Sequence, residues 1–181
     1  MTGRIVIVSG PPGAGKSTIA RRLADGAAGE LAVHLHTDDF YTYVRKGFVA
    51  PWLPAAQAQN IAIMNALAAS AAAFAAGGYE VVVDGIVGPW FFDPWLAAAK
   101  AQAIDLRYIA LAPDEATTVA RATARTAPGA MTDPAVVRTM WEQFQKFAPA
   151  PEHVVDTSGQ GVDETVAALK AGLAEGRFRL G

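Results

Sequence analysis

Short runs of apolar, mostly β-branched residues alternate along the chain with longer segments that favour helices. The runs predict five strands, at RIVIV (4–8), LAVHLH (31–36), YEVVVDG (79–85), DLRYIALAP (105–113) and EHVVDTS (152–158). Strands that alternate with helices are joined by right-handed crossovers, which produce a parallel sheet covered on both faces. The pattern therefore predicts an α/β fold with a five-stranded parallel sheet.

The segments between these runs predict helices with recognisable ends. They cover 17 to about 28, 55–76, 94–102, a segment opened by Asp114, a segment restarted at Pro134 and 162–173. Asp114 and Asp133 are N-cap candidates, and Pro134 suits the first helical position. We interpret the alanine-rich segment 61–78 as a buried helix, because it is short of the ~20 strongly apolar residues of a membrane span. No linker or repeat predicts a second domain, so 1–181 is expected to form one.

Composition narrows the classes of partner. The net charge is −2 and the chain has no cysteine. No basic field attracts nucleic acid or an acidic membrane, and disulfides and thiolate metal sites are excluded. The N-terminal apolar run is far too short for a signal peptide. We therefore expect a cytoplasmic protein that binds neither nucleic acid nor membrane.

The segment GPPGAGKST follows the first predicted strand and opens the first predicted helix. It satisfies G-x-x-x-x-G-K-[ST], the pattern of a phosphate-binding loop. Glycines let backbone N–H groups turn inward, and these groups face phosphate together with the helix N-terminus. Lys16 is expected to reach the β- and γ-phosphates of ATP, and the Ser17 hydroxyl to bind Mg²⁺. The expected ATP-binding residues here are Gly10, Gly13, Ala14, Gly15, Lys16, Ser17 and Thr18.

The chain resembles the small P-loop kinases that phosphorylate metabolites or antibiotics, such as gluconate kinase, chloramphenicol phosphotransferase and shikimate kinase. The resemblance lies in GPPGAGKST, TDDFY, VVVDG, RATAR and VVDTS, which follow one another in the expected order. It implies a three-layer P-loop NTPase fold with strand order 2-3-1-4-5 and helices on both faces. It also implies a short mobile lid, at about 121–133, and an acceptor pocket over the carboxyl ends of the strands.

Two acidic residues follow the second predicted strand, and a third lies at the end of the third predicted strand. DDFY is similar to the D-[SD]-F-[YF] of uridine-kinase-like and nicotinamide-riboside-kinase-like enzymes, which implies that Asp38 is the general base. Asp39 remains open as an acceptor-binding residue or a second candidate for the base, and either aspartate could instead cap a turn. Asp84 stands where P-loop proteins place the carboxylate that orients Mg²⁺. Without an evident third ligand, His34 and His36 are interpreted as satisfied core histidines rather than a metal pair.

Two arginines precede the expected lid. Arg121 and Arg125 are four residues apart and share one face of a helix. The resemblance implies that Arg121 packs against adenine and that Arg125 reaches the transferring phosphates. Arg138 is a weaker third candidate. The lid lacks the GHFM segment of gluconate kinases, which argues against gluconate as the acceptor.

The acceptor is expected to bind between two aromatic stretches, at about 38–60 and 85–95. We select Asp39, Tyr41, Arg45, Trp52 and Trp90 as acceptor-binding candidates, while at least half of the aromatic residues in these stretches are expected to be core. Because positive charge is scarce there, a neutral alcohol, a nucleoside or an antibiotic fits better than a polyanion.

Together these features predict a kinase that moves the ATP γ-phosphate to a hydroxyl of a small molecule, with Mg²⁺ as cofactor. The alternative is a P-loop ATPase or a nucleotide-dependent regulatory module with no small-molecule acceptor. Against an AAA-type ATPase, the chain leaves no room for a further helical domain. Against an RNA-end kinase, it has no basic tract. The sequence assigns no role to the C-terminal segment GRFRLG.

Overall fold

The computed structural model of the chain describes residues 3–126, 130–146 and 149–181. Five strands form one sheet: β1 (Arg4–Ser9), β2 (Ala32–His36), β3 (Glu80–Asp84), β4 (Asp105–Leu111) and β5 (Val154–Val155). Their order is β2-β3-β1-β4-β5, and every neighbouring pair is parallel. The predicted class and strand order are confirmed.

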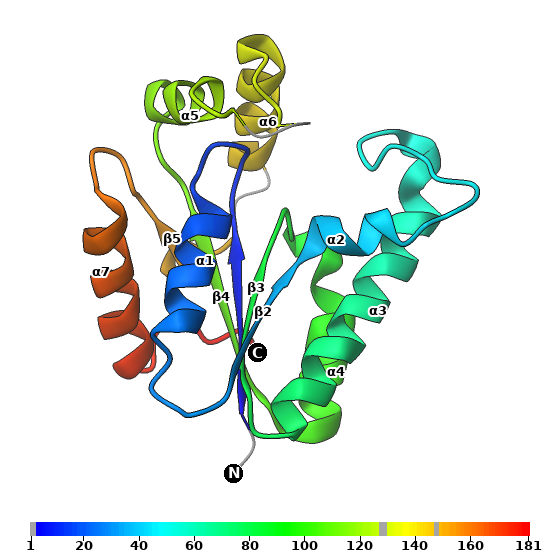
Figure 1. Ribbon diagram of the computed structural model, residues 1–181, viewed down its shortest axis with the longest axis vertical. Coiled ribbons are helices and arrows are strands. Elements are labelled where there is room, and N and C mark those ends of the chain that lie inside the picture. Colours follow the sequence, from blue (N-terminus) through cyan, green and yellow to red (C-terminus); the bar gives the residue numbers. More distant parts are fainter. Residues whose placement is uncertain (1–2, 127–129, 147–148) are drawn as a thin grey trace.

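Helices cover both faces of this sheet (Figure 1). They are α1 (Lys16–Asp25), α2 (Thr37–Thr42), α3 (Gln57–Ala76), α4 (Phe92–Gln102), α5 (Glu115–Thr123), α6 (Pro134–Lys146) and α7 (Val162–Ala174). In Figure 1, α1 and α7 lie on one side of the sheet, and α3 and α4 on the other. The helices α5 and α6 stand above the carboxyl ends of the strands, beside the loop between β1 and α1.

The central strand β1 is apolar on both faces because each face is covered. Ile5 and Ile7 pack in the core under α3 and α4, whereas Val6 and Val8 pack under α1 and α7. All four side chains are completely buried. Full burial of such a side chain contributes about 1.5–3 kcal/mol each. The resulting rigid strand positions the loop that follows Ser9.

The helical stretch Pro54–Ala76 is long and apolar enough to cross a membrane, with a mean hydropathy of 1.2, but 44% of its most apolar window is buried inside the fold. Its buried side chains, among them Leu67, Ala68 and Ala71, belong to the core shared with β1, β3 and α4. In this fold the stretch therefore contains a helix of the hydrophobic core, α3.

The structure differs from the predicted elements at three places. The polar TDDFYT, for which no helix was predicted, forms the helix α2. The first helix ends at Asp25, three residues before the predicted end. The last strand has two residues, because Pro151–His153 form a 3₁₀ turn before it. The expected N-caps are present: Asp114 Oδ1 accepts a hydrogen bond from Thr117 N at 2.6 Å, and Asp133 Oδ1 accepts one from Ala135 N at 2.8 Å.

The C-terminal segment pairs with β4, on the side of β4 that the short β5 leaves uncovered. Tyr108 N donates to Phe178 O at 2.8 Å, and Leu180 N donates to Leu106 O at 3.0 Å. Arg107 and Arg179 face each other across this antiparallel bridge. The segment therefore extends the sheet below β5 and satisfies backbone groups that an open edge would expose.

Candidate functional site

The loop between β1 and α1 presents a helix N-terminus to open space. Gly15, the N-cap of α1, has a φ of 88°, and a Cβ built there would meet no atom within 4 Å. The first turn of α1 carries no acidic residue and no side-chain cap. Gly13 also has a positive φ, and its Cβ would lie 2.4 Å from Thr118 O of α5. Glycine is therefore required for the packing of this loop, whose exposed helix end suits an anion.

The side chain of Lys16 folds back onto the loop that precedes α1 and lies near the other charged groups of the site. Its Nζ donates to Pro11 O at 2.9 Å. Burial lowers the pKa of Lys16 to about 8, and the positive charge of Arg125 adds to that effect, while Asp84 and Asp38 oppose it. The ammonium group of Lys16 thus has Asp84, Asp38 and Arg125 as electrostatic neighbours.

Asp84, at the end of β3, is completely buried and connects the phosphate loop to β2. Ser17 Oγ donates to its Oδ2 at 2.6 Å. Its Oδ1 lies 2.6 Å from His34 Nε2 and 3.0 Å from His36 Nδ1. Burial raises the pKa of Asp84, but the hydrogen bonds from the histidines and Ser17 outweigh this and hold it well below the usual range. Asp84 is therefore a carboxylate.

The sequence predicts that His34 and His36 are core residues with satisfied hydrogen bonds. In the structure both rings are hydrogen-bonded to the Asp84 carboxylate, but their side chains are 19% and 32% exposed, so they are not core residues. The contact follows from strand pairing, since His36 is the parallel partner of Asp84 in the register of β2 and β3. These two partners of Asp84 were missed because the predicted strand order makes the second and third strands neighbours but leaves the register between them open. The sequence signal that could have indicated this contact is the pair His34 and His36, which lie on one face of a strand that ends next to an acidic residue.

Asp38 lies in the first turn of α2, directly after β2, with its side chain 77% exposed. Its Oδ2 is 3.5 Å from His36 Nε2, and Thr37 Oγ1 donates to its Oδ1 at 3.3 Å. The contact with His36 lowers the pKa of Asp38. In turn, the contacts with Asp38 and Asp84 raise the pKa of His36 to about 10. Asp39 is also exposed, and its backbone carbonyl accepts a hydrogen bond from Thr42 Oγ1 at 2.6 Å.

A cavity of about 390 Å³ opens beside the phosphate loop. Loop residues 13–15 and the start of α1 form one wall, and Arg121 and Arg125 of the α5 region form a second. The third wall comes from the segment before α7 and the first turn of that helix, with Thr157, Gln160, Gly161, Val162 and Thr165. Thr18 also lines the cavity. The loop, the helix N-terminus and two arginines thus converge on one concave space.

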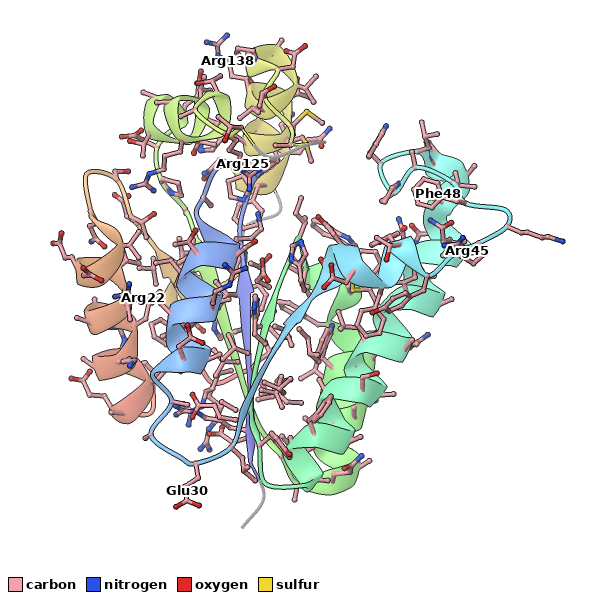
Figure 2. All side chains as sticks on the ribbon, in the orientation of Figure 1. Arg22, Glu30, Arg45, Phe48, Arg125 and Arg138 are labelled. Atoms are coloured by element: carbon pink, nitrogen blue, oxygen red, sulfur yellow. The ribbon has the colours of Figure 1, made fainter. Side chains whose placement is uncertain are left out.

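The arginines differ in their contacts. Arg121 donates to Thr157 O at 3.1 Å and to Gln160 O at 3.0 Å, so its guanidinium is fixed against the wall of the cavity. Arg125 is exposed, and Figure 2 shows it above the phosphate loop. Arg138 forms an ion pair of 2.6 Å with Glu115, which joins α6 to α5. Part of the expected lid, 127–129, lies outside the described residues.

The acceptor-binding candidates lie on two segments. Tyr41 OH donates to Asn60 Oδ1 at 3.0 Å, and Asn60 Nδ2 donates to Pro51 O at 2.8 Å, so α2 and the segment after it are both held on α3. Trp52 is 73% exposed. Figure 2 shows Arg45 and Phe48 at the outer end of α3, across the carboxyl edge of the sheet from Arg125.

Trp90 belongs to the second segment, in the 3₁₀ turn Pro89–Phe91, and is 51% exposed. Gly88 leaves room for its ring, because a Cβ on Gly88 would lie 2.2 Å from the indole. Phe91 and Trp95 of the same segment are buried at 9% and 0% exposure and belong to the core. The two segments therefore combine exposed aromatic rings with core residues.

The sheet order, the phosphate loop and α1 together define the fold of the P-loop kinases. The sequence matches the family AAA_33, described as an AAA domain, over residues 5–150, and the chain belongs to this family. No curated protein matches the sequence.

Solved structures of similar fold include several kinases. A sugar kinase from Janibacter sp. HTCC2649 has a TM-score of 0.71 at 16% identity, with 95% of each chain covered. A gluconokinase from Sinorhizobium meliloti 1021 has a TM-score of 0.68 at 20% identity, covering 96% of this chain and 93% of its own. The Mycobacterium tuberculosis APS kinase CysC, solved with AMPPNP and APS, has a TM-score of 0.68 at 18% identity, with 96% and 98% covered. At these identities the likeness shows the fold.

Proposed function

We propose that the protein is a kinase that transfers the γ-phosphate of ATP to a hydroxyl of a small, largely uncharged molecule. One observation carries the proposal. The phosphate-loop residues Lys16 and Ser17 lie with Asp84 at the edge of the sheet where Asp38 also stands, connected to Asp84 through His36. A phosphate site and an exposed carboxylate at one edge are what transfer to an alcohol requires.

The nucleotide would occupy the cavity beside the loop. Its phosphates would accept hydrogen bonds from the loop and the N-terminus of α1, with contributions from Gly10, Gly13, Ala14, Gly15 and Thr18. The Arg121 guanidinium, fixed by two carbonyls, offers a flat face for adenine stacking. Lys16 would exchange Pro11 O for the β- and γ-phosphates, and Arg125 would neutralise the transferring phosphoryl group.

Ser17 and Asp84 fit a magnesium site, because their hydroxyl and carboxylate oxygens are already adjacent at 2.6 Å. Oxygen ligands of this kind, completed by water and phosphate, are those that Mg²⁺ prefers. The ion would neutralise charge on the β- and γ-phosphates. Asp84 would orient the ion, and Ser17 would bind it.

Asp38 would act as the general base. Its carboxylate is exposed at the end of β2 and held ionised by His36, so it can accept the proton of the acceptor hydroxyl as the oxygen attacks phosphorus. The bond from the γ-phosphorus to the bridging oxygen breaks, ADP leaves, and the proton passes to solvent. ATP and an alcohol thus give ADP, a phosphate ester and one proton.

The acceptor region, at about 38–60 and 85–95, favours an uncharged or aromatic alcohol. The exposed rings of Trp52 and Trp90 supply apolar surface, while Tyr41 has its hydroxyl engaged by Asn60 and offers its ring. Arg45 is the cationic candidate near this region, and Asp39 would accept hydrogen bonds from acceptor hydroxyls. A region from about 121 to 133 would close over the phosphates as a lid and exclude water.

The experiment that tests this function measures ADP release from Mg·ATP in the presence of gluconate, shikimate, uridine, nicotinamide riboside and chloramphenicol, one at a time. We expect one compound to raise ADP release and to gain the mass of one phosphate. Lys16→Ala is the matched control, and it should abolish the transfer.

Rapid ADP release without any alcohol would instead support the ATPase alternative, to which the name of the family also points. Near-full activity in Lys16→Ala would exclude the phosphate loop as the site of transfer. Either result would contradict the proposal.

A further inference from the structure

His36 connects two carboxylates with different tasks. Its Nδ1 is 3.0 Å from Asp84 Oδ1, and its Nε2 is 3.5 Å from Asp38 Oδ2. His34 reaches the same Asp84 oxygen at 2.6 Å, but the contact with Asp38 belongs to His36. A fixed imidazole therefore stands between the buried carboxylate beside Ser17 and the exposed carboxylate on α2.

Asp38 needs such a contact. Its side chain is 77% exposed on a helix of six residues, and its second restraint is the 3.3 Å hydrogen bond from its sequence neighbour Thr37. An exposed aspartate rotates among rotamers unless a partner selects one. A base acts efficiently only when its oxygen is held within reach of the proton that it removes.

We propose that His36 is a positioning residue that holds the Asp38 carboxylate toward the acceptor hydroxyl and ties its position to Asp84 by using both ring nitrogens. The inference rests on the proposed function, since it assigns Asp38 the role of base. Because Asp84 is buried and also accepts from Ser17, the orientation of the base is coupled to the groups that face the phosphates. Each ring nitrogen of His36 thus faces one carboxylate, Nδ1 toward Asp84 and Nε2 toward Asp38.

Two substitutions separate the contacts of His36. In His36→Asn the amide nitrogen takes the position of Nδ1 and keeps the hydrogen bond to Asp84. In His36→Gln it takes the position of Nε2 and keeps the contact with Asp38. We expect turnover of the compound phosphorylated in the panel to fall about 10- to 100-fold in His36→Asn and less in His36→Gln, with the KM for ATP little changed in both. The opposite order, or equal losses, would overturn the proposal.

A spectroscopic test needs no acceptor. In ¹⁵N-labelled protein at neutral pH, the ring signals of His36 are those that His36→Gln removes. Asp38→Asn should shift the Nε2 signal of His36, Asp39→Asn should leave it in place, and the buried His153 serves as an internal reference for intact folding. An unmoved His36 signal in Asp38→Asn, or an equal shift in Asp39→Asn, would overturn the proposal that His36 positions Asp38. Failure of the wild-type protein to phosphorylate any compound would count against the proposed function, while these spectra would still decide whether His36 holds Asp38.

Discussion

The adjacent aspartates of α2 differ in what holds them. Both side chains are exposed, but Asp38 faces His36 and accepts a hydrogen bond from Thr37, whereas the hydrogen bond at Asp39 is accepted by its backbone carbonyl. Asp38→Asn should lower turnover by about 10²-fold or more, because a base acts in the transition state, and should leave ATP affinity nearly unchanged. Turnover with the phosphorylated panel compound and ATP binding by titration calorimetry measure the two effects separately.

Asp39→Asn is the matched control for this prediction, since it changes the same chemistry one residue further along the helix. We expect a small change in the KM for the acceptor. A large loss of turnover in Asp39→Asn, with Asp38→Asn active, would assign the base to Asp39.

Lys16 gives the site a predictable pH dependence. Its pKa is lowered to about 8, chiefly by burial, so the unliganded protein loses this positive charge as the pH rises through 8. ATP phosphates pair with the protonated form, and binding above that pH must take up a proton. The apparent Kd for Mg·ATP should therefore weaken by up to about tenfold per pH unit above 8, and stay nearly flat below it.

Titrations with Mg·ATP between pH 7 and pH 9 measure this dependence. Lys16→Met should bind more weakly and lose the dependence, because it carries no titrating group at that position. An affinity of the wild-type protein that is constant over this range would show that the pKa of Lys16 is not lowered and that Lys16 keeps its positive charge up to pH 9.

At the scale of elements, the end of β3 and the start of α2 are in close contact. A Cβ on Gly85 would lie 1.9 Å from Thr37 Oγ1 and 2.3 Å from Thr37 Cγ2. Gly85→Ala must therefore push α2 away from β3, and Asp38 moves with α2. We expect a loss of stability of about 1–3 kcal/mol and a clear fall in turnover, measured by urea unfolding and the ADP assay.

The double variant Gly85→Ala/Thr37→Ala removes the two closest atoms and should recover part of both losses. Gly29→Ala is the control, since its Cβ would meet no atom within 4 Å. A fully active and stable Gly85→Ala would show that α2 is not held by this contact.

The elements that sequence predicted well are those with strong local patterns. The buried runs of β1 and β3 and the loop before α1 are legible without tertiary contacts, and the strand order followed from the resemblance to P-loop kinases. The six-residue α2 was missed because a helix of that length is unstable alone. It depends instead on tertiary packing, with Thr37 buried beside Gly85 and Phe40 packed on the core.

The residues of the site could likewise be predicted from the sequence only where a local motif marks them. Lys16, Ser17 and Asp84 were selected from motifs, and their proximity follows from parallel strands ending at one edge. The partners of Asp84 on β2 were not predicted, since β2 and β3 are separated in sequence by α2 and α3. Only the register that places His36 opposite Asp84 reveals them. In this chain, contacts between distant strands convert isolated motif residues into a connected cluster.

At the scale of the whole molecule, the C-terminal segment covers part of the edge of β4, away from the phosphate loop (Figure 1). The side chain of Arg107 on β4 holds this segment in place. Its Nε and Nη2 donate to the two carboxylate oxygens of Asp105 at 2.8 and 2.9 Å, and its Nη1 donates to the carbonyls of Gly176 and Arg177. Its side chain is only 6% exposed, so these bonds are shielded from water.

Removing the Arg107 side chain leaves Asp105 and two carbonyls without this donor, so that backbone hydrogen bonds alone hold the segment on β4. Arg107→Ala should therefore destabilise the fold by about 3 kcal/mol. Arg179→Ala is the matched control, because that side chain is 68% exposed and 4.0 Å from Asp105, and its loss should cost less than about 0.5 kcal/mol. Urea unfolding measures both. Mg·ATP affinity at a temperature where Arg107→Ala is still folded should equal that of the wild-type protein, since Arg107 lies opposite Val6 and its side chain contacts the C-terminal segment rather than the phosphate loop. A weakened affinity under those conditions would mean that the closure of the sheet also sets the geometry of the site.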